Sequence, residues 1–315
     1  MEIRELTAQD VAGAASLLAA RHAAHRRREP LLPPQYEDPA TAQAQVEALW
    51  SAEGANGVVV VEGGRPAGYL LAAPRPDRTW GDNAWVEPAG LVSSSPEMTR
   101  ALYAHASQQW VDQGRDAHYV LVPAGEPAVL ETWWRLGFGL QHVHAAREPA
   151  PFPVRDGVRR ARPEDVPALV ELDLVLPEHQ AAAPVFSSGP VPDVEEVRAD
   201  MQETLEDERF AVLVAESGGE VLGSAVACPV ELSGAHSGLA RLDGATFFAF
   251  AAVRPGSRGG GWGRALGEAL LDLAHRSGAP AVISDWRSTN LLSSRAWTQL
   301  GYRETFWRMH RVVGF

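Results

Sequence analysis

The chain has 315 residues with 45% hydrophobic and 22% charged side chains, which is typical of a globular protein with two domains. Its formal net charge of −12 disfavours nucleic acid as a partner, because phosphate binding requires a basic face. The sequence has no apolar run of about 18 residues that could span a membrane, and its first residues lack the apolar segment of a signal peptide. We therefore expect a cytoplasmic protein that binds neither nucleic acid nor a membrane.

Two residue types narrow the chemistry further. The sequence contains no lysine, which excludes lysine Schiff-base chemistry and suggests the coding bias of a GC-rich bacterial genome. The single cysteine, Cys228, excludes an internal disulfide and a metal site built on several thiolates. Cys228 lies in the apolar stretch GSAVACPV, where we expect a buried, inert thiol. No metal site is predicted.

The elements of the first half follow from apolar periodicity and turn residues. A short strand leads into a capped helix start at residues 3–11, and a second helix is expected near Ala40–Trp50. Residues 57–74 are predicted to form a β-hairpin, because two apolar runs flank a glycine-containing turn. A strand, a helix, a strand, a helix and a final strand complete this half.

The second half repeats this order at a distance of about 155 residues. Residues 158–166 resemble residues 3–11, the predicted hairpin 210–229 matches 57–74, and WTQLGY (297–302) matches WWRLGF (133–138). A second helix is expected near Val191–Glu206, a buried strand over Phe247–Val253 and a further strand at AVISDW (281–286). The chain is therefore predicted to be an α/β (α+β) protein made of two copies of one domain, residues 1–150 and 157–315, joined by the proline-rich linker 147–157.

A glycine cluster in the second half indicates an anion site. The segment RGGGWG (258–263) follows the predicted buried strand and precedes a helix with leucines at helical spacing up to Gly278. Ordering so many glycines costs backbone entropy, so the cluster needs a reason. A strand, a glycine loop and a helix together present free N–H groups and the positive end of the helix dipole to an anion. The Rossmann spacing G-x-G-x-x-G fails here, and a P-loop needs a lysine.

The spacing that does fit is R-x-x-G-x-G, preceded by Val253-Arg254-Pro255. It resembles the coenzyme A loop of the GNAT superfamily of acyl-CoA N-acyltransferases. That family follows the loop with a helix, a strand and the pattern N-x-x-[AS]-x-x-x-Y-x-x-x-G-[FY], and this chain keeps the spacing from Asn290 to Tyr302 without a gap. The resemblance covers nearly all of the second half and implies two tandem acyl-CoA N-acyltransferase (GNAT) folds, each a mixed, curved sheet flanked by helices.

The resemblance also implies a binding site for acetyl-CoA as cosubstrate. The family's sheet splays between its fourth and fifth strands, and the pantetheine arm lies in that gap. The backbone of Ala251 and Val253 would bond the arm, and Asn290 would meet it from the other side. The residues that would hold the pyrophosphate are Arg258, Gly259, Gly260, Gly261, Trp262, Gly263 and Arg264.

The implied reaction is direct attack by an amine on the thioester within a ternary complex, with a backbone N–H at the end of the Phe247–Val253 strand stabilising the oxyanion. The family often uses a carboxylate acting through water as the base. Asp285, near the end of the following strand, is the main candidate. Asp243 and Glu178 are weaker candidates, because each is better explained as a surface carboxylate.

The acid that protonates the leaving thiolate departs from the family pattern. Trp297 stands where many members have tyrosine, and an indole N–H is too weak an acid for this role. Ser293, Ser294 or water must then protonate the thiolate, or it leaves unprotonated. The first half also has tryptophan at this position, Trp133, so the substitution is consistent with packing of the last helix.

The first half departs much further from the pattern. Residues 87–96 (EPAGLVSSSP) replace the glycine loop, and Glu126 stands in the place of Asn290. A carboxylate near a phosphate site opposes anion binding by charge repulsion. We therefore expect a degenerate copy that shapes the acceptor cleft, covers the other domain or binds another small molecule.

The expected function is transfer of an acetyl group from acetyl-CoA to a primary amine of a small molecule. The acidic net charge could attract a cationic acceptor such as an aminoglycoside or a polyamine. Three alternatives remain open: a non-catalytic acyl-CoA sensor, a mycothiol-synthase-like acetyltransferase, and a structural or interaction protein whose glycine loop does not bind coenzyme A. Whether the protein is a monomer or a homodimer is open as well.

Overall fold

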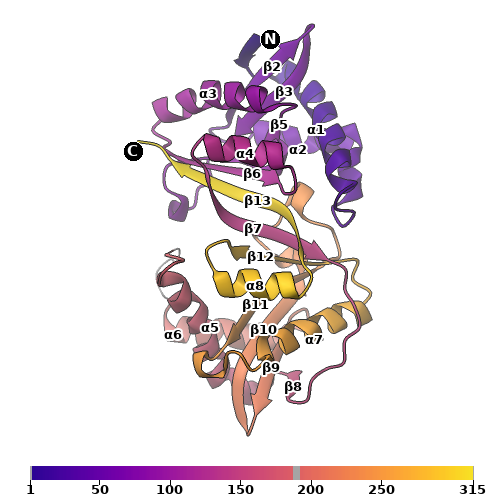
Figure 1. Cartoon of the computed structure of the whole chain (residues 1–315), viewed down its shortest axis with the longest axis vertical. Coiled ribbons are helices and arrows are strands. Elements are labelled where there is room, and N and C mark those ends of the chain that lie inside the picture. Colours follow the sequence, from indigo (N-terminus) through magenta and orange to yellow (C-terminus); the bar gives the residue numbers. More distant parts are fainter. Residues whose placement is uncertain (1, 187–191, 315) are drawn as a thin grey trace. The chain divides into compact units, whose positions relative to one another are not determined.

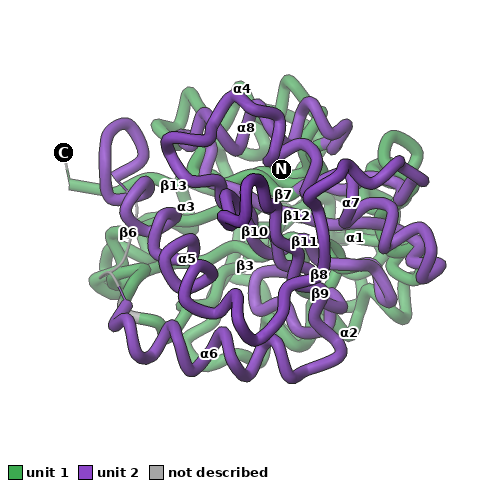
Figure 2. Tube along the Cα trace, turned by 90° about the horizontal axis from the view of Figure 1, so that it is seen from below, with its two compact units in different colours: residues 1–144, 237–241, 304–315 green, residues 145–236, 242–303 purple. Residues whose placement is uncertain are grey.

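The computed structural model describes residues 2–186 and 192–314 of the chain (Figure 1). Its contacts divide the chain into two compact units, which are coloured separately in Figure 2. Unit 1 consists of residues 1–144, 237–241 and 304–315, and unit 2 consists of residues 145–236 and 242–303.

The first half of the chain alternates helices and strands as expected from its periodicity. Its elements are, in chain order, β1 (Glu2–Glu5), α1 (Val11–Arg26), α2 (Pro39–Trp50), β2 (Asn56–Glu62), β3 (Arg65–Ala72), β4 (Asn83–Val86), β5 (Leu91–Val92), α3 (Pro96–Asp112), β6 (Ala117–Pro123), α4 (Pro127–Arg135) and β7 (Gly139–Arg147). The hairpin predicted over residues 57–74 is confirmed as β2 and β3.

The second half repeats this order of elements, apart from the additional short strand β5. Its elements are β8 (Val158–Arg160), α5 (Val166–Ala181), α6 (Val194–Glu206), β9 (Ala211–Ser217), β10 (Glu220–Pro229), β11 (Thr246–Val253), α7 (Trp262–Arg276), β12 (Val282–Arg287), α8 (Leu291–Gln299) and β13 (Arg303–Val312). The helix expected over 191–206 begins at Val194, and Val191 lies outside the described residues.

An ion pair recurs at equivalent places in the two halves. Arg4 on β1 contacts Asp10 at 2.7 Å, just before α1, and Arg159 on β8 contacts Asp165 at 2.7 Å, just before α5. Each aspartate also accepts a backbone N–H from the residue three positions earlier, which fixes the helix start. This repetition confirms the internal duplication.

Unit 1 contains a sheet that is buried on both faces. Its strands run in the order β1-β2-β3-β5. Val58 and Val60 pack with residues of α3 on one face, whereas Val59 packs with residues of α1 on the other. The alternation of side chains along a strand explains why VVVV is a continuous apolar run here.

The last strand of the chain belongs to unit 1. Strand β13 pairs antiparallel with β6 from Phe306, opposite Pro123, to Val312, opposite Ala117. In unit 1 the order of these strands is β4-β6-β13-β7. The compact units therefore differ from the expected boundaries of 1–150 and 157–315, because residues 304–315 make their strand pairs within unit 1.

Unit 2 contains a mixed sheet with an opening between two of its strands. Its order is β12-β11-β10-β9-β8. Strands β11 and β12 are parallel but pair only at Thr246 with Val282 and at Phe247 with Ile283. Beyond these pairs the two strands separate, whereas β4 and β6 of unit 1 pair along the whole of β4. Strands β11 and β12 of the second copy are thus the splayed pair that the family resemblance implies.

Candidate functional site

A cavity of about 420 Å³ lies in unit 2 beside the part of β11 that no longer pairs with β12. Its wall is formed by residues of β11, the glycine loop, the first turn of α7, α8 and the last turns of α5. The α5 side and the strand contribute apolar groups such as Val175, Leu176 and Phe248, and the loop contributes backbone and arginine side chains. An elongated ligand with an apolar arm and an anionic end fits this distribution.

The glycine loop has the conformation for which glycine is required. Gly259 has φ +83° and Gly261 has φ +77°, a region that costs other residues about 1–2 kcal/mol. Gly261 is the N-cap residue of α7 and provides no side chain to bond the first N–H groups of the helix. Those N–H groups stay available to an anion, and the helix dipole adds to their attraction.

The cavity wall includes most of the residues predicted to bind the cosubstrate. These wall residues are Ala251, Val253, Arg258, Gly259, Gly261, Trp262, Gly263, Arg264 and Asn290. Gly260 is not part of the wall. Its carbonyl instead accepts a hydrogen bond of 2.8 Å from Arg155, which approaches the loop from outside.

Arg155 is a loop contact that the sequence analysis missed. Its guanidinium carbon lies 3.7 Å from the centre of the Trp262 ring, a cation–π geometry. Arg155 belongs to the segment between β7 and β8 and lies 105 positions from Gly260. It fixes the first residue of α7 and brings a further cation to the loop.

Asn290 connects the start of α8 to the end of α5. Its side chain is buried, and its Oδ1 accepts the backbone N–H of Ser293 at 3.2 Å, which caps the helix. His179 Nε2 lies 3.3 Å from the same Oδ1. His179 and Ser293 both belong to the cavity wall. His179 was not predicted from the sequence, although it follows Leu172 and Val175 at helical spacing on α5.

Trp297, at the position of the family's tyrosine, is a packing residue that also borders the cavity. Its ring meets Phe248 edge to face at 4.6 Å and Tyr302 at 5.3 Å, and it stacks on Trp286 at 6.3 Å. It is almost fully buried, as expected for a core aromatic residue.

Two of the three predicted catalytic residues lie outside the cavity wall. Trp286 faces Trp297, so its neighbour Asp285 points to the opposite face of β12. There Asp285 Oδ2 lies 3.6 Å from Nε2 of His236, whose pKa is lowered by burial and raised to a lesser extent by the Asp285 charge. Ser294 donates to the carbonyl of Ser288 at 3.4 Å, whereas Ser293 borders the cavity. The weaker candidates Asp243 and Glu178 are also absent from the wall.

In unit 1 the corresponding region is filled by an arginine. Arg21 stands at the same place in α1 as Leu176 in α5. Its guanidinium donates to the carbonyls of Pro88, at 2.7 Å, and Leu91. Ser95 also caps the first turn of α3 by accepting the Met98 N–H, so that turn is not free for an anion.

The glutamate at the position of Asn290 has a partner in unit 1. Glu126 forms an ion pair of 2.7 Å with Arg28. Unit 1 therefore has Arg21 in the corresponding region, a helix start capped by Ser95 and the carboxylate of Glu126. Unit 2 has an open cavity, the uncapped start of α7 and the buried Asn290 at these places.

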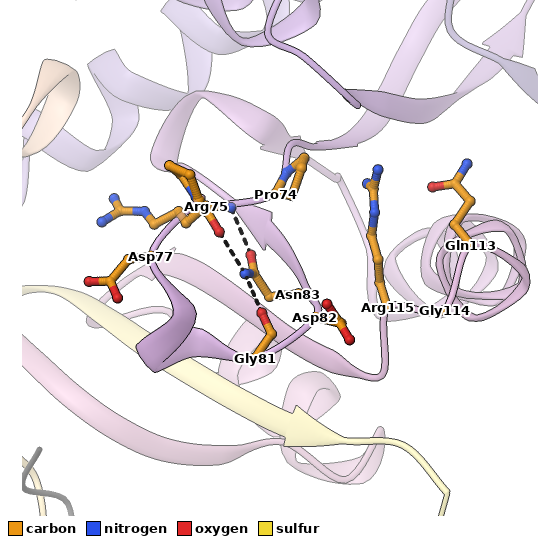
Figure 3. A pocket seen from close by; sticks show the side chains of 10 residues that line it. Pro74, Arg75, Asp77, Gly81, Asp82, Asn83, Gln113, Gly114 and Arg115 are labelled. Atoms are coloured by element: carbon orange, nitrogen blue, oxygen red, sulfur yellow. Dashed lines mark hydrogen bonds between the residues drawn. The ribbon is translucent and has the colours of Figure 1, made fainter.

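A second cavity, of about 660 Å³, lies in unit 1 (Figure 3). Asn83 fixes its rim, accepting the Arg75 N–H and donating to the carbonyls of Arg75 and Gly81, each at 2.9 Å. Its charged wall residues balance one another: Arg75, Arg115, Asp77 and Asp82. This cavity precedes the start of β4, whereas the glycine loop follows the end of β11, so the two sites are not equivalent.

Three further properties of the described residues concern the single cysteine, possible metal ligands and possible membrane-spanning helices. Cys228 is buried, as expected, and burial raises the pKa of its thiol to about 11. Within residues 2–186 and 192–314, no three His, Cys, Asp or Glu side chains gather as metal ligands would. No helix in the same part of the chain has the length and hydropathy to cross a membrane.

The chain is similar to several solved structures along almost its whole length. The chain is similar to a GCN5-related N-acetyltransferase from Sphaerobacter thermophilus, with 16% identity, a TM-score of 0.58 and coverage of 99% of this chain and 95% of the other. It also aligns with a tandem GNAT protein from the clavulanic acid biosynthesis pathway (16% identity, TM-score 0.49, coverage 100% and 99%). A GNAT acetyltransferase from Colwellia psychrerythraea aligns at 10% identity, TM-score 0.47 and 98% coverage of both chains.

The first of these likenesses supports the fold over the whole chain and no more than the fold. No curated protein sequence matches the chain. Residues 175–302, which include the cavity, the glycine loop and α8, match the acetyltransferase (GNAT) family. Residues 175–302 therefore resemble GNAT acetyltransferases in sequence, and the whole chain shares the fold of a GCN5-related N-acetyltransferase.

Proposed function

We propose that this protein transfers an acetyl group from acetyl-CoA to a primary amine of a small molecule, using the cavity of unit 2. The observation that carries the proposal is the convergence of three features on one cavity: the part of β11 beyond its last pair with β12, the uncapped start of α7 and the buried Asn290. The family uses acetyl-CoA, and the matched segment contains all three features.

The described residues fit acetyl-CoA in shape and charge. The N–H groups at the start of α7 can bond phosphate oxygens, and Arg258 and Arg264 add positive charge beside them. The apolar wall from β11 and α5 suits the pantetheine arm. When bound, acetyl-CoA supplies an acyl thioester that an amine can attack.

The protein's own contribution to this reaction is positioning and polarisation. Beyond Phe247 the edge of β11 no longer pairs with β12, so backbone N–H groups there can stabilise negative charge on an acyl oxygen. The cavity holds both reactants at near-attack distance, which replaces a bimolecular encounter. The net charge of −12 favours a cationic acceptor at long range.

Unit 1 is proposed to bind no acetyl-CoA. Arg21 occupies the region that would receive the arm, and Ser95 satisfies the helix start that would receive the pyrophosphate. One cosubstrate per chain is the expected stoichiometry.

The experiment is an assay of thiol release from acetyl-CoA with a panel of amines that includes aminoglycosides, polyamines and a cysteinyl amino sugar. Amine-dependent release, with an N-acetylated product detected by mass spectrometry, would support the proposal. The Gly263→Glu variant is the control, because a carboxylate at the anion site should abolish both binding and release. Tight acetyl-CoA binding without turnover of any amine would favour the non-catalytic sensor instead.

A further inference from the structure

The wall of the unit 2 cavity contains one histidine, His179. Among the described residues of its wall there is no aspartate, glutamate, cysteine or tyrosine, and the sequence has no lysine. The ionisable wall residues are Arg258 and Arg264, which stay charged, and His179. Histidine is the residue type that most often accepts and returns protons in catalysis.

The contacts of His179 also define which ring nitrogen can accept a proton. Asn290 Oδ1 accepts the Ser293 N–H, which identifies this atom as the amide oxygen. An amide oxygen only accepts hydrogen bonds, so Nε2 of His179 must carry the hydrogen that points to it at 3.3 Å. In the neutral ring, the lone pair is then on Nδ1.

The same contacts hold the ring in place. His179 lies in the last turn of α5, and Asn290 is buried at the residue directly before α8. A histidine whose second nitrogen is bonded to a buried amide keeps one tautomer and one orientation. This is the arrangement that general base catalysis requires.

We propose that His179 carries the proton of the acceptor amine to the leaving sulfur, an inference that rests on the proposed function. The amine nitrogen forms a bond to the acyl carbon, and its proton passes to Nδ1 of His179. The carbon–sulfur bond breaks, and the imidazolium returns that proton to the sulfur. A neutral amine and a thioester thereby become an amide and a thiol, and His179 ends neutral.

This role accounts for two departures from the family pattern at once. The main carboxylate candidate, Asp285, faces away from the cavity. Trp297 packs against Phe248 in place of the tyrosine acid. A single histidine in the wall can serve as both base and acid, because the proton it receives is the proton it gives.

The test compares His179→Gln, His179→Ala and the control His275→Gln, an exposed histidine in the last turn of α7. Acetyl-CoA affinity is measured by calorimetry and turnover by amine-dependent thiol release. We expect both His179 variants to bind acetyl-CoA within about threefold of wild type and to lose about 10²–10⁴-fold in kcat. Added imidazole should restore part of the rate of His179→Ala, whereas His275→Gln should behave as wild type.

Three outcomes would overturn the inference. If the wild type turns over an amine and His179→Gln keeps its kcat, His179 does not transfer the proton and the proposed function stands. If His179→Ala loses activity that imidazole does not restore, its role is structural. If the wild type binds acetyl-CoA but turns over no amine, the proposed function fails and the role of His179 fails with it.

Discussion

Gly263 allows the binding role of the glycine loop to be separated from its structural role. Its φ is not in the left-handed region, and a Cβ added there would lie 3.6 Å from Cγ2 of Val253, an ordinary contact. Replacement by alanine therefore causes no strain and improves helix propensity by up to about 1 kcal/mol. Because Gly263 and Val253 both belong to the cavity wall, the new methyl group occupies the space through which a phosphate approaches the helix start.

We expect Gly263→Ala to keep or raise the melting temperature and to weaken acetyl-CoA binding. Loss of one hydrogen bond to a charged group costs about 1.5–3 kcal/mol, which corresponds to a factor of about ten to a hundred in Kd. Calorimetry gives the affinity, and thermal unfolding monitored by circular dichroism gives the stability.

Gly260→Ala is the matched control, because it adds the same methyl group to the same loop outside the cavity wall. Its Cβ would lie 3.3 Å from Cδ1 of Trp262, which requires a small adjustment of that ring. We expect its acetyl-CoA affinity to stay within about threefold of wild type. Equal losses of affinity in the two variants, or a Gly263→Ala protein that binds normally, would refute the reasoning.

Three further predictions follow from contacts within each unit. Arg155→Gln removes the cation–π contact with Trp262 and the hydrogen bond to the Gly260 carbonyl. It should weaken acetyl-CoA binding by about 0.5–2 kcal/mol, measured by calorimetry. Unchanged affinity would mean that the loop is ordered without Arg155. Leu176→Arg places in unit 2 the side chain that Arg21 provides in unit 1. It should abolish acetyl-CoA binding while the far-ultraviolet circular dichroism spectrum is retained. Normal binding would show that Arg21 is not what prevents acetyl-CoA binding in unit 1. Burial lowers the pKa of His25 from 6.5 to about 3, so its contribution to stability is complete above pH 6.5 and is lost as the pH falls towards 3. The urea midpoint should therefore fall between pH 7.5 and pH 5, and this fall should be smaller in His25→Leu; identical pH profiles would contradict the prediction.

The parts of the fold that the sequence predicted are those encoded by local patterns. Apolar runs on either side of paired glycines predicted both hairpins, and repeated motifs predicted the duplication. The glycine loop was predictable because the left-handed conformation of Gly259 and Gly261 leaves a strong local signal. Most of its residues indeed border the cavity.

The contacts that sequence reasoning missed join distant segments. His179 meets Asn290 across 111 positions, and Arg155 meets Gly260 across 105. No local pattern encodes such a pairing, although the helical spacing from Leu172 placed His179 on the inner face of α5 and its neighbour Glu178 off that face. The sequence also does not show that Asp285 lies outside the cavity wall, where its neighbour Trp286 packs on Trp297.

The pairing of the last strand could not be predicted for a related reason. The repeated order of elements predicts a final strand in the second half but does not specify which strand lies beside it. The segment expected to complete the second domain pairs instead with β6 in unit 1.

The central claim is that one acetyl-CoA site exists per chain and that it is the cavity of unit 2. A calorimetric titration of the whole chain with acetyl-CoA, repeated on Leu176→Arg, tests it most directly. The account predicts a stoichiometry of one site per chain in the wild type and no binding in the variant. Two sites per chain, or one site that persists in Leu176→Arg, would contradict it.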